Sequence, residues 1–143
     1  MLVVGIVGIL SVLATPLFLT YYQGSRLRVA AEQVAAAVNQ ARQLGIRGNA
    51  GACVHISATA LQYRLGSCAG ANWVGPGTST TGDVAAPPGI TLTTTVDPLF
   101  SYLGAANPGA TITVTNAQTG SVLRVVVAAS GRICIAPNPP TCP

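Results

Sequence analysis

Charged residues are scarce in this chain of 143 residues. Only 7% of the sequence is charged, against about 25% in an average soluble domain. The charged set comprises seven Arg, two Asp and one Glu, with no Lys, which gives a formal net charge of +4. Because the arginines are spread along the sequence, they do not form the dense basic patch of a dedicated nucleic-acid-binding domain.

Side chains for catalysis or metal binding are equally few. The chain has one His and three carboxylates. His55 and Ser57 would share one face of a strand about 7 Å apart, but a catalytic triad would also need a carboxylate. Asp83 and Asp97 lie in loop-like sequence. We therefore expect His55 to be a surface histidine on an edge strand, and we expect no enzyme activity and no cofactor.

The first twenty residues, in contrast, contain no charge at all. A helix of this length rises about 30 Å, which matches the hydrocarbon core of a bilayer. The alternative is a cleaved signal peptide, but no basic segment precedes the apolar run and no Ala-x-Ala-like site follows it. Tyr21 and Tyr22 come next, where interfacial aromatic residues lie. We predict a membrane-spanning or assembly helix half over residues 1–24.

Three residues in this segment suit packing against other helices. Gly5 and Gly8 provide small surfaces where a second helix can approach closely. Pro16 removes one backbone hydrogen bond, which membrane helices tolerate when neighbouring groups satisfy the freed carbonyl. We predict that these three residues take part in helix packing and assembly.

From residue 25 the helical pattern becomes amphipathic. Small and aliphatic residues recur at alternating four- and three-residue steps, which places them on one helical face. These residues are Leu27, Ala31, Val34, Val38, Ala41 and Gly45. We predict that residues 25–50 pack on a globular domain and that one helix of roughly 45 residues ends at the glycines that follow.

Residues 51–143 show a period of two, which indicates β-strands. We predict strands over 53–57, 61–65, 90–96, 99–103, 111–115, 122–128 and 131–135. Residues 67–89 form a long loop, or a loop with one poor strand, in which Trp73 is a core residue or a loop anchor. The fold class is therefore α+β, with a long helix packed on a small antiparallel β-domain.

Four cysteines lie in the β-rich part and allow three pairings. We favour Cys53–Cys68 and Cys134–Cys142, because each closes a short local loop. The alternative, a zinc site with His55, lacks any C-x-x-C pair. Two disulfides indicate an oxidising compartment. Arg26 and Arg28 just after the apolar run would favour the opposite orientation, but long domains translocate largely regardless of charge.

The N-terminal stretch LVVGIVGILSVLATP resembles the helix of type IV pilins and type II secretion pseudopilins, including Gly8-Ile9-Leu10 eight residues before Pro16. The later sequence is similar to the GspH/FimT group of minor pilins and pseudopilins. The matching features are the Ala41-Arg42 pair, the strand VHIS, the Gly-Trp segment around Trp73 and the terminal Gly131-Arg132 strand. The family's early glutamate would fall two residues before Met1, so we expect the natural start to lie upstream.

This resemblance implies a minor structural subunit of a type II secretion pseudopilus or a type IV pilus. Its implied partners are other pilin or pseudopilin subunits, the inner membrane and the assembly platform, with the β-domain in the periplasm. The alternative is a FimT-like minor pilin that binds DNA for transformation, with Arg64, Arg124 and Arg132 as candidate contacts. Against it, Cys134 replaces the second Arg of the group's Gly-Arg-x-Arg pattern.

Overall fold

The computed structural model describes the backbone of residues 2–136 and the side chains of residues 21–136. Three sequence predictions therefore concern positions outside the described residues. They are the apolar character of the first helix half, the packing role of Gly5, Gly8 and Pro16, and the Cys134–Cys142 disulfide.

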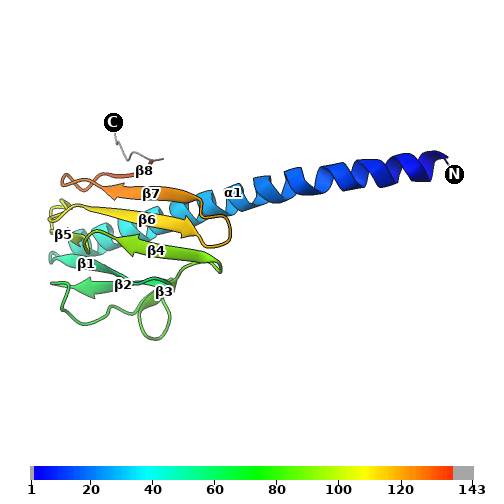
Figure 1. Ribbon diagram of the computed structural model, residues 1–143. Coiled ribbons are helices and arrows are strands. Elements are labelled where there is room, and N and C mark those ends of the chain that lie inside the picture. Colours follow the sequence, from blue (N-terminus) through cyan, green and yellow to red (C-terminus); the bar gives the residue numbers. More distant parts are fainter. Residues whose placement is uncertain (1, 137–143) are drawn as a thin grey trace.

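A single helix, α1 (Leu2–Arg47), begins the fold. Its 46 residues confirm the predicted length of about 45, and the helix extends well beyond the β-sheets toward the N-terminus (Figure 1). It ends in the predicted glycine-rich segment, where the amide of Gly48 donates to the Leu44 carbonyl at 2.9 Å. Asn49 has a φ of 45°, a left-handed conformation that a short polar side chain tolerates at a helix end.

Two four-stranded antiparallel sheets lie beside each other against α1 (Figure 1). The first sheet has the order β3-β2-β1-β5 and comprises β1 (Ala52–Ile56), β2 (Ala60–Leu65), β3 (Asp83–Ala85) and β5 (Leu99–Phe100). The second sheet has the order β4-β6-β7-β8 and comprises β4 (Ile90–Thr94), β6 (Ala110–Asn116), β7 (Val122–Val127) and β8 (Ile133–Ala136). The predicted α+β class is confirmed.

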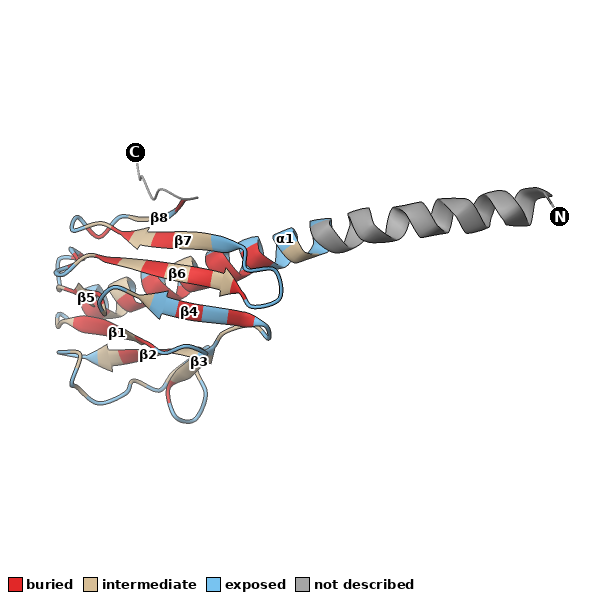
Figure 2. Cartoon of the chain, in the orientation of Figure 1, coloured by how far each residue is buried: buried red, intermediate tan, exposed pale blue. Residues whose placement is uncertain are grey.

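The core forms where the inner faces of both sheets meet the helix (Figure 2). On β6 the apolar residues Ala110, Ile112 and Val114 are buried, and the threonines between them are half-buried on the other face. This alternation is the period of two seen in the sequence. Val54 on β1 and Leu61 on β2 are buried in the same way in the first sheet.

The loop between β2 and β4 contains one short strand, β3, as the sequence allowed. Trp73 anchors this loop, because its ring packs on the core with its centroid 6.0 Å from that of Tyr63. A Cβ atom at Gly75 would lie 2.1 Å from the Trp73 ring, so only glycine fits beside it. The predicted strand at 99–103 is shorter than expected, since β5 ends at Phe100.

Candidate functional site: the helix surface and its two flanks

The buried stripe of α1 is the one that the sequence predicts. All six of its residues are buried, and the five that have side chains beyond hydrogen are at most 5% exposed. The six are Leu27, Ala31, Val34, Val38, Ala41 and Gly45. Small residues in this stripe let the sheets come close to the helix. A Cβ atom at Gly45 would lie 3.2 Å from the Ala50 carbonyl oxygen and 3.4 Å from the Ala52 Cβ. Both sheets therefore pack closely on the second half of α1.

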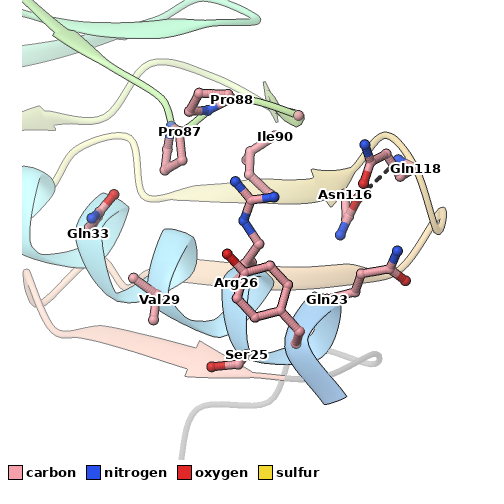
Figure 3. Close-up of a pocket in the computed structure, with 12 residues that line it drawn as sticks. Gln23, Ser25, Arg26, Val29, Gln33, Pro87, Pro88, Ile90, Asn116 and Gln118 are labelled. Atoms are coloured by element: carbon pink, nitrogen blue, oxygen red, sulfur yellow. Dashed lines mark hydrogen bonds between the residues drawn. The ribbon is translucent and has the colours of Figure 1, made fainter. Parts of the chain in front are cut away.

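One flank of α1 carries a groove beside the point where the helix leaves the domain (Figure 3). This cavity of about 290 Å³ lies between the helix, the Pro87-Pro88 segment and the turn after β6. The Arg26 guanidinium carbon lies 5.4 Å from the centroid of the Tyr22 ring, a cation–π distance. The amide of Gln118 donates to Asn116 Oδ1 at 2.9 Å and shapes the far wall.

The same flank is hollowed further along the helix. A second cavity of about 270 Å³ shares Gln33 and Pro87 with the first, and a third of about 210 Å³ shares Gln40 with the second. We call this row of cavities the long groove. It follows α1 from Tyr22 to Arg47.

The opposite flank is built around Arg42. Its Nε donates to the Gly104 carbonyl at 2.9 Å, and this contact joins the helix to the loop after β5. A Cβ atom at Gly131 would lie 1.8 Å from the Gly104 carbonyl oxygen and 3.1 Å from the Arg42 Nε, so the turn after β7 requires glycine here. Arg132 follows at the rim of a cleft of about 420 Å³. Arg42 and Gly131 belong to two of the four sequence features that resemble the GspH/FimT group.

The three candidate DNA contacts are not gathered at one place. Arg64 lies on β2 of the first sheet, where it donates to the Cys68 carbonyl, to Gln62 and to Asn72. Arg124 lies on β7 opposite Ala136, and Arg132 lies in the turn at the far end of the same hairpin. Four residue steps separate these two arginines along the hairpin, or roughly 13 Å at the rise of a strand. DNA contact by these residues stays a prediction.

The prediction that His55 lies on an edge strand is wrong, whereas its predicted place at the surface agrees with a side chain that is 39% exposed. His55 lies on β1, an inner strand of the first sheet, and its Nδ1 is 2.7 Å from Asp97 Oδ2. The other Asp97 oxygen accepts a hydrogen bond from the Ile56 amide at 3.1 Å. The chain segment between β4 and β5 brings Asp97 here as it crosses from one sheet to the other, which strand periodicity cannot reveal.

The hydroxyl of the nearby Ser57 is engaged elsewhere and does not act as a nucleophile for this His–Asp pair. Ser57 Oγ donates to the Ala60 carbonyl at 2.9 Å and accepts from the Ala60 amide, so it closes the β1–β2 turn. The side chains of His55 and Asp97 are 39% and 24% exposed. The contacts of Asp97 with His55 and with the Ile56 amide therefore hold the β4–β5 connection against β1.

Two other polar groups of the first sheet have shifted pKa values. Hydrogen bonds from Thr81 and Gln62 lower the pKa of Asp83 on β3. Burial raises the pKa of Tyr63 to about 12, because the phenolate would lose its hydration in the core. The Tyr63 hydroxyl donates to Gln40 Oε1 at 3.3 Å, which ties β2 to the long groove side of α1.

One of the two predicted disulfides is present. Cys53 on β1 and Cys68 after β2 are bonded, with their Cα atoms 5.0 Å apart. Cys134 lies on β8, and its predicted partner Cys142 is outside the described residues, so that pairing stays a prediction. Within the described part of the chain no cysteine is free.

Two features are absent from the described residues. Length and hydropathy identify no membrane-crossing helix among them. No group of three or more His, Cys, Asp or Glu side chains comes together in that same part of the chain.

Comparison with known proteins gives a fold assignment. No family model and no curated protein sequence matches the chain. Among solved structures, GspH of Escherichia coli aligns with a TM-score of 0.64 at 15% identity, over 83% of this chain and 93% of GspH.

Two further structures agree with this assignment. The minor pseudopilin EpsH of the Vibrio cholerae type 2 secretion system aligns with a TM-score of 0.62 at 10% identity, over 80% of this chain and 99% of EpsH. The type IV minor pilin FimU of Pseudomonas aeruginosa aligns with a TM-score of 0.55 at 17% identity, over 79% of this chain and 90% of FimU. The chain therefore has the fold of the GspH-like minor pilins and pseudopilins.

Proposed function

We propose that this protein is a structural subunit of a type II secretion pseudopilus or a type IV pilus and that it assembles through its N-terminal helix. The observation that carries the proposal is α1 itself, which is clamped to the domain from Leu27 to Gly45 yet continues far beyond it (Figure 1). The fold shared with GspH, EpsH and FimU supports the same conclusion. A helix that long, with half of it outside its own domain, needs another environment to cover it.

The proposed environments are the inner membrane first and neighbouring helices afterwards. Residues 1–20 are uncharged, and lipid tails are about as apolar as leucine side chains. Exchange of lipid for sister helices therefore costs little free energy. Gly5 and Gly8 would allow close helix approach, and Pro16 would free one carbonyl for a neighbour to satisfy.

The second half of α1 also leaves a surface for neighbours to cover. Val29 is 48% exposed and Ile46 is 45% exposed, although both lie on a helix whose opposite face is fully buried. Ala36 is exposed between them. In the proposed filament, adjacent subunits pack against this outer face of the helix.

A charge in the first helix half tests the proposal. Val12→Arg should abolish recovery of the chain in sheared filaments or pseudopili, because an arginine among packed apolar helices is unpaired and costly. Val12→Leu is the matched control and should assemble at the normal level. Immunoblots of the sheared and cell fractions measure assembly.

The folded state of the domain must be checked in the same cells. Non-reducing peptide mapping should recover the Cys53–Cys68 pair from Val12→Arg, which shows that the globular domain has folded. Normal filament incorporation of a correctly folded Val12→Arg chain would contradict assembly through the helix.

A further inference from the structure

The four outer strands of the two sheets differ in how their open edges are covered. The edge of β4 is covered by the β1–β2 turn, because the Leu92 amide donates to the Ala58 carbonyl at 2.9 Å. The edge of β5 is covered by the following loop, where the Asn107 amide donates to the Leu99 carbonyl at 2.8 Å. On β3, the Asp83 carbonyl accepts from the Ser79 amide at 2.8 Å. Three edges are therefore at least partly occupied by the chain itself.

Among the residues that the structure describes, the edge of β8 is the exception. The Ala128 amide donates to the opposite Arg132 carbonyl at 2.8 Å, so this is a hydrogen-bonded pair of the β7–β8 hairpin. Because such pairs alternate along an antiparallel ladder, the next bonded pairs are Val126–Cys134 and Arg124–Ala136. The backbone groups of Ile133 and Ile135 consequently point away from β7. Among the described residues, no backbone hydrogen bond reaches these outward groups.

The open edge adjoins a furrow along the β8 flank of α1. Ile135 is 38% exposed and lines a cavity of about 170 Å³ with Arg28 and Leu123. Ile133 lines the cleft of about 420 Å³ with Ala35, whose small side chain leaves the furrow open. Apolar side chains and unpaired backbone groups on one short edge are the features that allow strand addition.

Basic side chains lie at both ends of this edge. Arg42 and Arg132 line the cleft beside Ile133, and Arg28 lines the cavity beside Ile135 and Ala136. Glu32 is the one carboxylate on this part of the helix in the described chain, and it pairs with Arg28 at 3.2 Å in solvent. Such an exposed pair is worth about 0–1 kcal/mol, so Arg28 exchanges partners readily. The flank therefore complements negative charge.

We propose that an extended segment of a partner protein, with an acid–x–apolar–x–acid pattern, adds as a fifth strand to the edge of β8. The central apolar residue enters the furrow over Ala35, and the two carboxylates lie near the arginines at its ends. Four residue steps run from Arg132 to Ala136, or roughly 13 Å, and the same number of steps separates positions i and i+4 of an extended strand. This contact is separate from helix-mediated assembly and does not depend on it.

The test measures amide hydrogen exchange by NMR on the full chain in detergent micelles. The probe is the blocked peptide Thr-Glu-Thr-Val-Thr-Glu-Thr at millimolar concentration, and the matched control has Lys in place of both Glu. The acidic peptide should slow exchange of the Ile133 and Ile135 amides at least tenfold and leave that of Val126, on the neighbouring strand, unchanged. The basic peptide should give no slowing.

Two variants separate strand addition from simple charge attraction. Ile135→Pro removes one outward amide without removing a bond to β7, and it should abolish the protection of Ile133. Ile135→Thr keeps this amide, so the peptide should still protect the Ile133 amide from exchange. Arg132→Gln should weaken peptide binding about tenfold. Arg42 is left unchanged because it holds Gly104.

The proposal is overturned if the acidic peptide gives no protection, if the basic peptide protects equally, or if Ile135→Pro leaves binding intact. It is also overturned if the Ile133 and Ile135 amides are already protected in the peptide-free chain, since another part of the chain then covers the edge. Should Ile135→Pro lose amide dispersion in β6 and β7, Arg132→Gln and the peptide charge reversal still decide the outcome.

Discussion

The two sheets of this domain are held together in different ways. In the second sheet, β6 is paired with β4 over five residues and with β7 over six, so a regular backbone ladder spans the sheet. In the first sheet, β5 pairs with β1 at two positions only and β3 pairs with β2 at three. Because short strands form few backbone hydrogen bonds, contacts between side chains must provide more of the stability of this sheet.

Three side-chain contacts join parts of the first sheet, and in the second sheet Cys134 on β8 is not a free cysteine either. The three in the first sheet are the Cys53–Cys68 disulfide, the His55–Asp97 pair and the contact between Gln62 and Asp83. On the second sheet, threonines and aliphatic residues alternate along β4 and β6. The short strands of the first sheet therefore depend more on the Cys53–Cys68 bond and on polar side-chain contacts, whereas the longer ladder of the second sheet depends more on burial and backbone pairing.

Of the changes considered, removal of the Cys53–Cys68 disulfide should have the largest effect on the stability of the first sheet relative to the second. A Cys53→Ala/Cys68→Ala chain loses a cross-link over a sequence separation of 15, which is worth about 3 kcal/mol of unfolding free energy. Amide exchange should accelerate first in β1 and β2, while β6 and β7 keep most of their protection. Urea unfolding and residue-resolved hydrogen exchange measure the two effects.

Thr93→Ala, on the exposed face of β4, is the control for this experiment and should change stability by less than about 0.5 kcal/mol. Equal loss of protection in both sheets of the double mutant would contradict the distinction. The two sheets would then unfold as one cooperative unit.

Alkaline pH provides a second test that acts on the first sheet through Tyr63. The raised pKa means that the folded state holds the phenolic proton more tightly, so this stability is complete below pH 10 and is lost as pH rises toward 12. Between pH 9 and 11.5 we expect a loss of about 2 kcal/mol. The chain has no lysine, which removes the usual competing titration in this range.

Tyr63→Phe isolates this contribution, because it keeps the buried ring and removes the ionisable group. Its unfolding free energy, measured by urea titration at each pH, should fall by about 2 kcal/mol less than that of the unmodified chain over the same range. Identical pH profiles for the two proteins would show that burial of the Tyr63 hydroxyl does not control alkaline unfolding.

The smallest expected effect comes from the His55–Asp97 pair. Asp97→Asn keeps an oxygen for the Ile56 amide and removes the charge that faces His55, so we expect a loss of about 1 kcal/mol at neutral pH. Thermal unfolding with His55→Gln as the companion variant measures it. If neither substitution changes the midpoint, the contact between His55 and Asp97 does not stabilise the attachment of the β4–β5 connection to β1.

Much of the fold was predictable because the signals were local. The helix stripe from Leu27 to Gly45 follows from 3.6-residue periodicity, and strands such as β6 follow from alternation. The Cys53–Cys68 bond followed from the preference for a short loop. The division into two sheets was not predictable, because β4 and β5 are neighbours in sequence but belong to different sheets.

The candidate site was predicted only in part for the same reason. Arg42 and Gly131 were singled out separately as sequence motifs, and nothing in their spacing showed that they meet at Gly104. The open edge of β8 was also hidden, because the covering of the other edges by Ala58 and Asn107 depends on loops packing back across the domain.

The sequence by itself determined the long helix, the alternating strands and the near absence of catalytic groups, because each of these depends on residues that are close along the chain. Only the tertiary structure decided that Asp97 would meet His55, that Arg42 would meet the two glycines, and that no other described strand or loop would cover the outer edge of β8. Those outcomes depend on contacts between distant segments, and such contacts form only when burial against α1 fixes the positions of both sheets.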